Sequence, residues 1–359
     1  MLSELPIEVL HYIVFKGLLR VNDVLNLALT CKWAHNAILG TEHDRNQHKY
    51  LAGMQVAKDK QWPDVILLYL KRSRLPAFVL HNLLHWSAQN GHTRVAQVLL
   101  QNPDCDPSDD DSLALQLAAS EGHTDVLRLL LEDGRSDATA DRNYSISLAA
   151  DMGFCENIKL LLPVPGVDPK RAFYSAAKRG NLEVMKLLLE ISDPSCEQNI
   201  AVITAAEYGK LEIVHLLLQD SRVDPSDDEN LAIGKAMWNN HIAIVSLLLQ
   251  DPRVNPFDLN GVYFINACFD GLTDVVALLL RDSRVKPNYN NNAPLCSAAQ
   301  NGHQSIVYLL LQHPDVDPNE CVVSAAIGGH VQILKVLLED SRMKPEMQNH
   351  PAVILAFRD

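Results

Sequence analysis

The stretch AASEGHTDVLRLLL, residues 118–131, decides the fold of this chain. Ala118 and Ala119 are small residues of high helix propensity, and a Gly-His pair follows them after two positions. Beyond Gly122, Val126 and Leu129–Leu131 give the apolar spacing of a second helix. The stretch therefore predicts two short helices that are joined by a tight turn at Gly122.

The same pattern recurs along most of the chain, with the turn residue, here called the anchor residue, every 27 to 31 positions. A regular spacing of this size indicates stacked repeats. A degenerate tenth unit has Gln61 as its anchor residue, 30 residues before the first clear one. The anchor residues of the nine clear repeats are Gly91, Gly122, Gly153, Gly180, Gly209, Asn240, Gly271, Gly302 and Gly329.

Each repeat ends in a break before the next one begins. Most breaks contain a proline, as in Asp224-Pro225 and Asp317-Pro318, which cannot continue a helix and favours extended geometry just before it. Pairs of small residues before the anchor, such as Ala205-Ala206, allow neighbouring helices to approach closely. The predicted fold class is all-α, and each unit is a helix, a turn, a helix and an extended connection.

The string A-A-x-x-G-H-x-x-V-x-x-L-L-L resembles the ankyrin repeat, and the resemblance covers roughly residues 55–359. It implies an ankyrin-repeat solenoid of about nine to ten repeats. The family's Thr-Pro-Leu-His start survives only in part, as Asn82–His85, and the period is mostly 31 rather than ~33 residues. We therefore expect the hairpin between repeats to be shortened or irregular. Ala352–Ala356 would begin a final half repeat, which either caps the array or reflects a truncated sequence.

The first 40 residues do not fit the repeat and predict three short helices, followed by a linker over residues 41–54. Ser3–Pro6 has the acidic residue and proline of a helix start. Asn22 suits the N-cap of the second helix, and Cys31–Leu39 forms the third. Three such helices bury too little surface to be stable alone.

The segments LPIEVLHYIV (residues 5–14) and DVLNLALTCKW (residues 23–33) resemble an F-box. Thr30 and the position of Trp33 directly after Lys32 depart from that family. The resemblance implies docking on the Skp-type adaptor of a Skp–cullin–F-box ubiquitin ligase, with the following domain recruiting the substrate. The expected adaptor-contacting residues are Leu5, Pro6, Val9, Leu10, Ile13, Leu25 and Leu27. The alternative is a plain ankyrin scaffold in which these helices only cap the array.

The composition narrows the class of partner. A formal charge of −13 argues against nucleic acid and anionic membranes, whose binding needs clustered cations. The chain has no basic leader at its start and no apolar run of ~18 residues. Its seven cysteines lie far apart, which predicts free buried thiols in a reducing, intracellular compartment, cytoplasmic or nuclear.

Three recurring polar features have structural explanations that we prefer to functional ones. The histidines after the anchors, such as His123, recur once per repeat at ~8–10 Å, too far apart to share a metal ion, and are expected to form hydrogen bonds in the loops. The arginines after the leucine triplets, such as Arg222, are expected to neutralise helix carbonyls. Asp109–Asp111 and Asp227–Glu229 lack the ligand alternation of a calcium loop.

Nothing in the pattern predicts an enzyme, a cofactor or a metal site, because repeats place side chains in parallel rows and no phosphate-binding loop occurs. In ankyrin-like arrays the two positions before each anchor face the concave side and should be polar. Three consecutive repeats instead carry Tyr208, Trp238 and Phe269 there, and exposed aromatic clusters mark interaction sites. Met152 and Arg179 occupy the same two positions in other repeats, and all five residues are the predicted partner-binding set.

Overall fold

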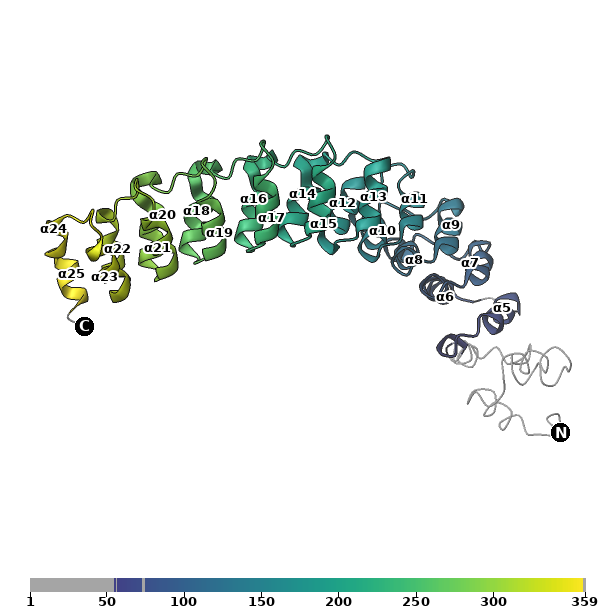
Figure 1. Ribbon diagram of the computed structural model, residues 1–359. Coiled ribbons are helices and arrows are strands. Elements are labelled where there is room, and N and C mark those ends of the chain that lie inside the picture. The colour runs from purple at the N-terminus through teal and green to yellow at the C-terminus, as the bar shows by residue number, and fades with distance from the viewer. Residues whose placement is uncertain (1–54, 56, 73–74, 358–359) are drawn as a thin grey trace. The chain divides into compact units, whose positions relative to one another are not determined.

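The computed structural model describes residues 55, 57–72 and 75–357 (Figure 1). The helices predicted for residues 1–40 and the linker at 41–54 lie outside these residues, and so do all the predicted adaptor contacts, from Leu5 to Leu27. Among the described residues the chain is helical and contains no β-strand, as the pattern predicted. The chain divides into two compact units, Met1–Asp168 and Pro169–Asp359, and we describe each by itself.

The described part of the first unit consists of α5 and three helix pairs. In each pair the first helix ends just before an anchor residue and the second begins two residues after it. The helices are α5 (Pro63–Arg72), α6 (Ala77–Gln89), α7 (Thr93–Leu100), α8 (Asp109–Ser120), α9 (Thr124–Asp133), α10 (Ala140–Met152) and α11 (Cys155–Leu161).

The second unit continues the same alternation, and its pairs stand side by side in Figure 1. Its last helix, α25, packs on α22, the first helix of the last complete pair. The elements are α12 (Pro169–Arg179), α13 (Leu182–Ile191), α14 (Cys196–Glu207), α15 (Leu211–Leu218), α16 (Asp227–Trp238), α17 (Ile242–Leu249), α18 (Asp258–Phe269), α19 (Thr273–Leu279), α20 (Tyr289–Gln300), α21 (Gln304–Leu311), the 3₁₀ helix η2 (Asn319–Cys321), α22 (Val322–Ile327), α23 (Val331–Glu339), α24 (Pro345–Gln348) and α25 (Pro351–Ala356).

The core of each unit lies where the helices of neighbouring repeats meet. The paired alanines, such as Ala205 and Ala206, are fully buried between successive first helices, because only small side chains fit there. The central leucine of each triplet, such as Leu217 and Leu248, is also fully buried, which confirms the predicted helix phase. Burial of a leucine side chain contributes about 1.5–3 kcal/mol, so these two rows account for much of the stability.

The anchor residues are the turns between paired helices. All ten, including Gln61 and Asn240, have positive φ angles, between 57° and 88°. At Gly302 the requirement is also steric, because a Cβ atom there would lie 2.7 Å from Cε1 of His330. Glycine is therefore favoured at this position both by its backbone angle and by the ring that packs against it.

The connections between repeats contain an unusual left-handed turn where a hairpin was expected to be shortened. In five repeats, three consecutive residues at the start of the first helix have φ between 46° and 66°. Before four of the five turns an Asp carboxylate accepts the backbone N–H two residues later; the Asp224 carboxylate, for example, accepts from the Ser226 N–H at 2.9 Å. Left-handed geometry costs non-glycine residues about 1–2 kcal/mol each, so surrounding bonds must hold these turns.

Candidate protein-binding face

The histidines that follow the anchors link neighbouring repeats. Nε2 of His123, His303 and His330 donates to a backbone carbonyl two residues before the preceding anchor, at 3.1, 2.7 and 3.0 Å. A carbonyl oxygen can only accept, so Nε2 carries the proton. His92 instead bonds the Gln61 side chain at 2.9 Å, and burial lowers its pKa. The predicted hydrogen-bonding role is confirmed.

The arginines after the leucine triplets bind carbonyls, but not those of their own helix as we expected. Arg342 Nη2 donates to the carbonyl of Leu311, which ends the second helix of the preceding repeat, at 2.8 Å. Arg284 bonds Leu249 in the same way at 3.1 Å. Each guanidinium also pairs with the aspartate two residues before it, and these hydrogen bonds hold the pKa of Asp282 and Asp340 below the usual value. The arginines therefore link neighbouring repeats by hydrogen bonds and do not form a basic surface.

A third set of hydrogen bonds between neighbouring repeats was not predicted from the sequence. The last residue of each left-handed turn is Asn or Ser, and its side-chain oxygen accepts the backbone N–H found 25 residues later. Asn230 Oδ1 accepts from Asn255 at 2.7 Å, and Asn292 Oδ1 accepts from Asp317 at 2.9 Å. An asparagine recurs at this position in the sequence. Its hydrogen bond could not be predicted, because only the left-handed turn brings its side-chain amide close to the next connection.

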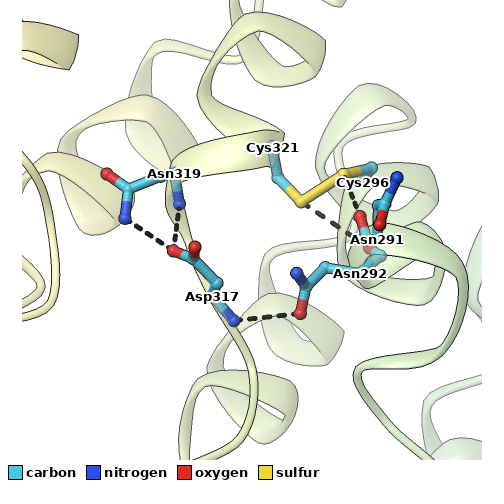
Figure 2. Close-up of a disulfide and its surroundings, with 6 residues drawn as sticks. All are labelled: Asn291, Asn292, Cys296, Asp317, Asn319 and Cys321. Carbon is cyan, nitrogen blue, oxygen red and sulfur yellow. Dashed lines mark hydrogen bonds between the residues drawn. A yellow bond between two sulfur atoms is a disulfide. The ribbon is translucent and has the colours of Figure 1, made fainter.

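A disulfide corrects the prediction that all cysteines are free thiols. Cys296 of α20 and Cys321 of η2 are bonded, with their Cα atoms 4.5 Å apart (Figure 2). They are 25 residues apart, the same offset as the asparagine ties, so the repeat geometry brings them together. Cys105 and Cys268 are free and buried, as predicted, whereas Cys155 is free but half-buried; burial raises the pKa of Cys105 to about 11.

The acidic stretches take part in hydrogen bonds within the repeats. Asp227 is half-buried and accepts a hydrogen bond from Asn199 at 2.9 Å, so it braces a turn. Within the described residues, no group of three or more His, Cys, Asp or Glu side chains is placed to hold a metal ion. No helix in this part of the chain is long and apolar enough to cross a bilayer.

The three predicted aromatic residues lie on the surface of the second unit. Trp238 and Phe269, the last residues of α16 and α18, are 72% and 53% exposed, and Tyr208, just after α14, is 41% exposed. These helices pack on one another in sequence, α14 on α16 and α16 on α18. Among the described residues no helix covers these three side chains, which we call the aromatic face. Tyr208 stands one position nearer its anchor than the other two.

A lysine is part of the surface at the α14 end of the aromatic face. The Lys178 ammonium lies 5.4 Å from the Tyr208 ring centroid and 5.7 Å from that of Tyr174. Cation–π contacts at such distances contribute about 0.5–1 kcal/mol at exposed sites. Lys235 of α16 pairs with Glu207 at 2.9 Å. The charged groups at this end are thus largely paired with neighbouring side chains.

Departures from the repeat pattern concentrate between α16 and α18. Asn240 replaces the anchor glycine, and Leu272 stands where a histidine follows five other anchors. Tyr263 occupies a position that is alanine in the three preceding repeats, and Gly234 makes room for it, because a Cβ atom there would lie 2.4 Å from the ring. The other described repeats stack without a Gly–Tyr pair at these two positions, so stacking does not need it.

Beside Trp238 lies a shallow hollow that opens to solvent and has a volume of about 10 Å³. Leu272 cannot donate the hydrogen bond that His241 and His303 give to the preceding repeats at 3.0 and 2.7 Å, so the Trp238 carbonyl receives no such bond. Asn266 and Asp270, both exposed, stand at its edge. Its main lining residues are Gly234, Met237, Trp238, Tyr263, Asn266, Asp270 and Leu272.

Comparison with known families settles the class of this fold. A family model for ankyrin repeats in three copies matches residues 54–143, 84–172, 146–229, 173–258, 233–320 and 263–349. The chain belongs to the ankyrin-repeat family. A search of curated proteins gives no match. The matched range begins at residue 54, so the F-box-like segment lies outside it.

Ankyrin repeats are protein-interaction modules, and proteins built from them are typically scaffolds without enzymatic activity. Two further residues belong to the predicted partner-binding set. Met152 ends α10 in the first unit and is 58% exposed. Arg179 ends α12 and is exposed in the second unit. Ile327, at the end of α22 and 71% exposed, occupies the same repeat position as Trp238 and Phe269 but was not among the predicted residues.

Proposed function

We propose that this ankyrin-repeat protein binds a protein partner through the aromatic face. The observation that carries the proposal is the exposure of Trp238, 72%, at the place where the repeat pattern is broken. Tryptophan and tyrosine dominate the binding energy of protein interfaces. The hollow beside Trp238, at about 10 Å³, is far below the ~300–1,000 Å³ of small-molecule pockets, which favours a peptide or a helix as the ligand.

A peptide library tests the proposal without knowledge of the natural partner. Random 12-residue peptides displayed on phage, at about the length that spans three repeats at ~10 Å each, are selected on the immobilised full chain. Selected peptides are then measured by isothermal titration calorimetry against the wild type, Trp238→Ala and Tyr308→Ala. Tyr308 is a matched control, because it is an exposed aromatic residue on α21, a second helix.

We expect Trp238→Ala to weaken binding by about 2 kcal/mol or more, the level of an interface hot spot, and Tyr308→Ala to change it little. The midpoint of thermal unfolding should be nearly the same in both variants, because each side chain is exposed. Selected peptides that bind Trp238→Ala as tightly as the wild type would place the interaction elsewhere and overturn the proposal.

We further propose that the chain is the substrate-recruiting subunit of a Skp–cullin–F-box ubiquitin ligase. The support is the ordered match of Leu5, Pro6, Ile13 and Leu25 to an F-box, followed by an interaction module. An adaptor of this kind raises the effective concentration of the target at the ligase. Its competitor is the plain scaffold, in which these helices only cap the array.

Purified Skp adaptor gives a direct test of this second proposal. Binding to the wild type should be lost in the double variant Ile13→Asp/Leu25→Asp and kept in Trp238→Ala, because the two surfaces are separate in sequence. Deletion of residues 1–40 should also abolish adaptor binding and leave the repeats folded by circular dichroism. Melting of the repeats on deletion, or no binding by the wild type, would favour the scaffold.

A further inference from the structure

We propose that the exposed surface over the hollow between α16 and α18, with Trp238 and Asp270 at its edge, binds an arginine side chain of the bound protein. The proposal rests on the protein-binding function proposed above and names the chemistry of one contact. Trp238 and Tyr263 both line the hollow, and tryptophan is the best partner for a cation stacked on its face.

Acceptors surround the same hollow. The Asp270 carboxylate is exposed and forms no ion pair with any described residue, and Asn266 stands one helical turn before it. Among the residues directly before the anchors of the second unit, Asp270 is the single acid. The Trp238 carbonyl adds a third acceptor, because Leu272 has replaced the histidine that would donate to it. Described donors do not satisfy these groups, so a ligand that brings donors fits better than an apolar one.

Arginine matches this arrangement more closely than other side chains. Its planar guanidinium stacks on an aromatic ring and offers five N–H donors in a fork that a carboxylate binds through two hydrogen bonds. The nearest lysine on α16, Lys235, is already paired with Glu207 and does not neutralise Asp270. The chain's net charge of −13 also favours the approach of a cationic partner.

Nuclear magnetic resonance of the tryptophan indole N–H groups reads out the subsite. The chain has four tryptophans, and the Trp238 signal is assigned by its loss in Trp238→Phe. N-acetyl-arginine amide is titrated into the full chain, with N-acetyl-citrulline amide as its uncharged isostere. We expect a saturable shift of the Trp238 signal with the arginine compound and none with the citrulline compound.

Three variants locate the binding. Asp270→Asn should weaken binding of the arginine compound by about tenfold or more, since it removes the charged acceptor. Asp274→Asn, the same charge change at an exposed site on α19, should leave binding unaltered. Leu272→His restores the residue of the regular pattern, so it should fill the hollow, abolish binding and keep the unfolding midpoint at or above that of the wild type.

Equal shifts from both compounds, or an undiminished response in Asp270→Asn, would overturn the subsite. The outcome is separable from that of the proposed function. If the library peptides lose binding in Trp238→Ala but the arginine compound does not shift Trp238, the protein-binding face stands and the arginine subsite fails. If the arginine compound binds but the peptides bind Trp238→Ala as tightly as the wild type, the arginine subsite stands and the proposed protein-binding face fails.

Discussion

The α8–α9 repeat and the α16–α17 repeat have the same fold but differ in what their surfaces offer. Around Gly122 the sequence follows the pattern throughout, and the residues before the anchor are Ser120 and Glu121. Around Asn240 the buried rows are kept, whereas Trp238 replaces the polar residue and stands 72% exposed. Stacking therefore constrains the buried rows and the hydrogen bonds between repeats. It leaves the ends of the first helices free to carry a binding surface.

The largest effect is expected where the two repeats agree. Leu130→Ala and Leu248→Ala each remove a fully buried side chain, so each should cost about 2–5 kcal/mol of unfolding free energy through the cavity that is left. Urea unfolding followed by circular dichroism measures both. A cost for Leu248 far below that for Leu130 would show that the α16–α17 repeat is loosely packed, and would break the comparison.

The disulfide is a departure that should add stability. Because it closes a loop of 25 residues, reduction of Cys296–Cys321 should lower the unfolding free energy by about 3 kcal/mol. The measurement is urea unfolding with and without a phosphine reductant, and Cys296→Ser, which cannot form the bond, should show no response to the reductant. Identical curves for the wild type under both conditions would mean that the bond does not contribute.

The anchor residues give a smaller and more selective effect. Gly302→Ala should cost about 1–3 kcal/mol, because φ is 82° and the new Cβ atom would displace His330. Asn240→Gly should change the unfolding free energy by less than about 0.5 kcal/mol, since asparagine tolerates its φ of 58°. Equal costs in thermal unfolding would show that the two anchors are under the same constraint.

Much of the fold could be predicted from the sequence because stacking repeats one physical requirement many times. The anchor pattern located Gln61 and Asn240 as turns although neither is glycine, and both have positive φ. The disulfide was missed because Cys296 and Cys321 occupy different positions in their repeats, and only the three-dimensional register brings them together. The target of Arg342 was missed for the same reason, since the bonded carbonyl, Leu311, belongs to the preceding repeat.

The candidate site was predictable in part. The exposure of Trp238 and Phe269 follows from their place at the end of the first helix, which the anchors fix. The hollow did not follow, because it needs Leu272, Gly234 and Tyr263 together, and each looks like an ordinary apolar or small residue when considered alone. Sequence patterns find rows of side chains, whereas a hollow depends on the shapes of neighbours from different rows.

One measurement tests most directly the claim that the pattern carries the fold and the departures carry the binding. In the double variant Trp238→Ser/Phe269→Gln, each residue takes the identity found at the same position in a regular repeat, Ser120 and Gln300. The unfolding free energy and the affinity for a library-selected peptide are measured on one preparation. The account predicts an unfolding free energy within about 0.5 kcal/mol of the wild type and a loss of about 2 kcal/mol or more in binding. A large loss of stability with unchanged affinity would contradict it.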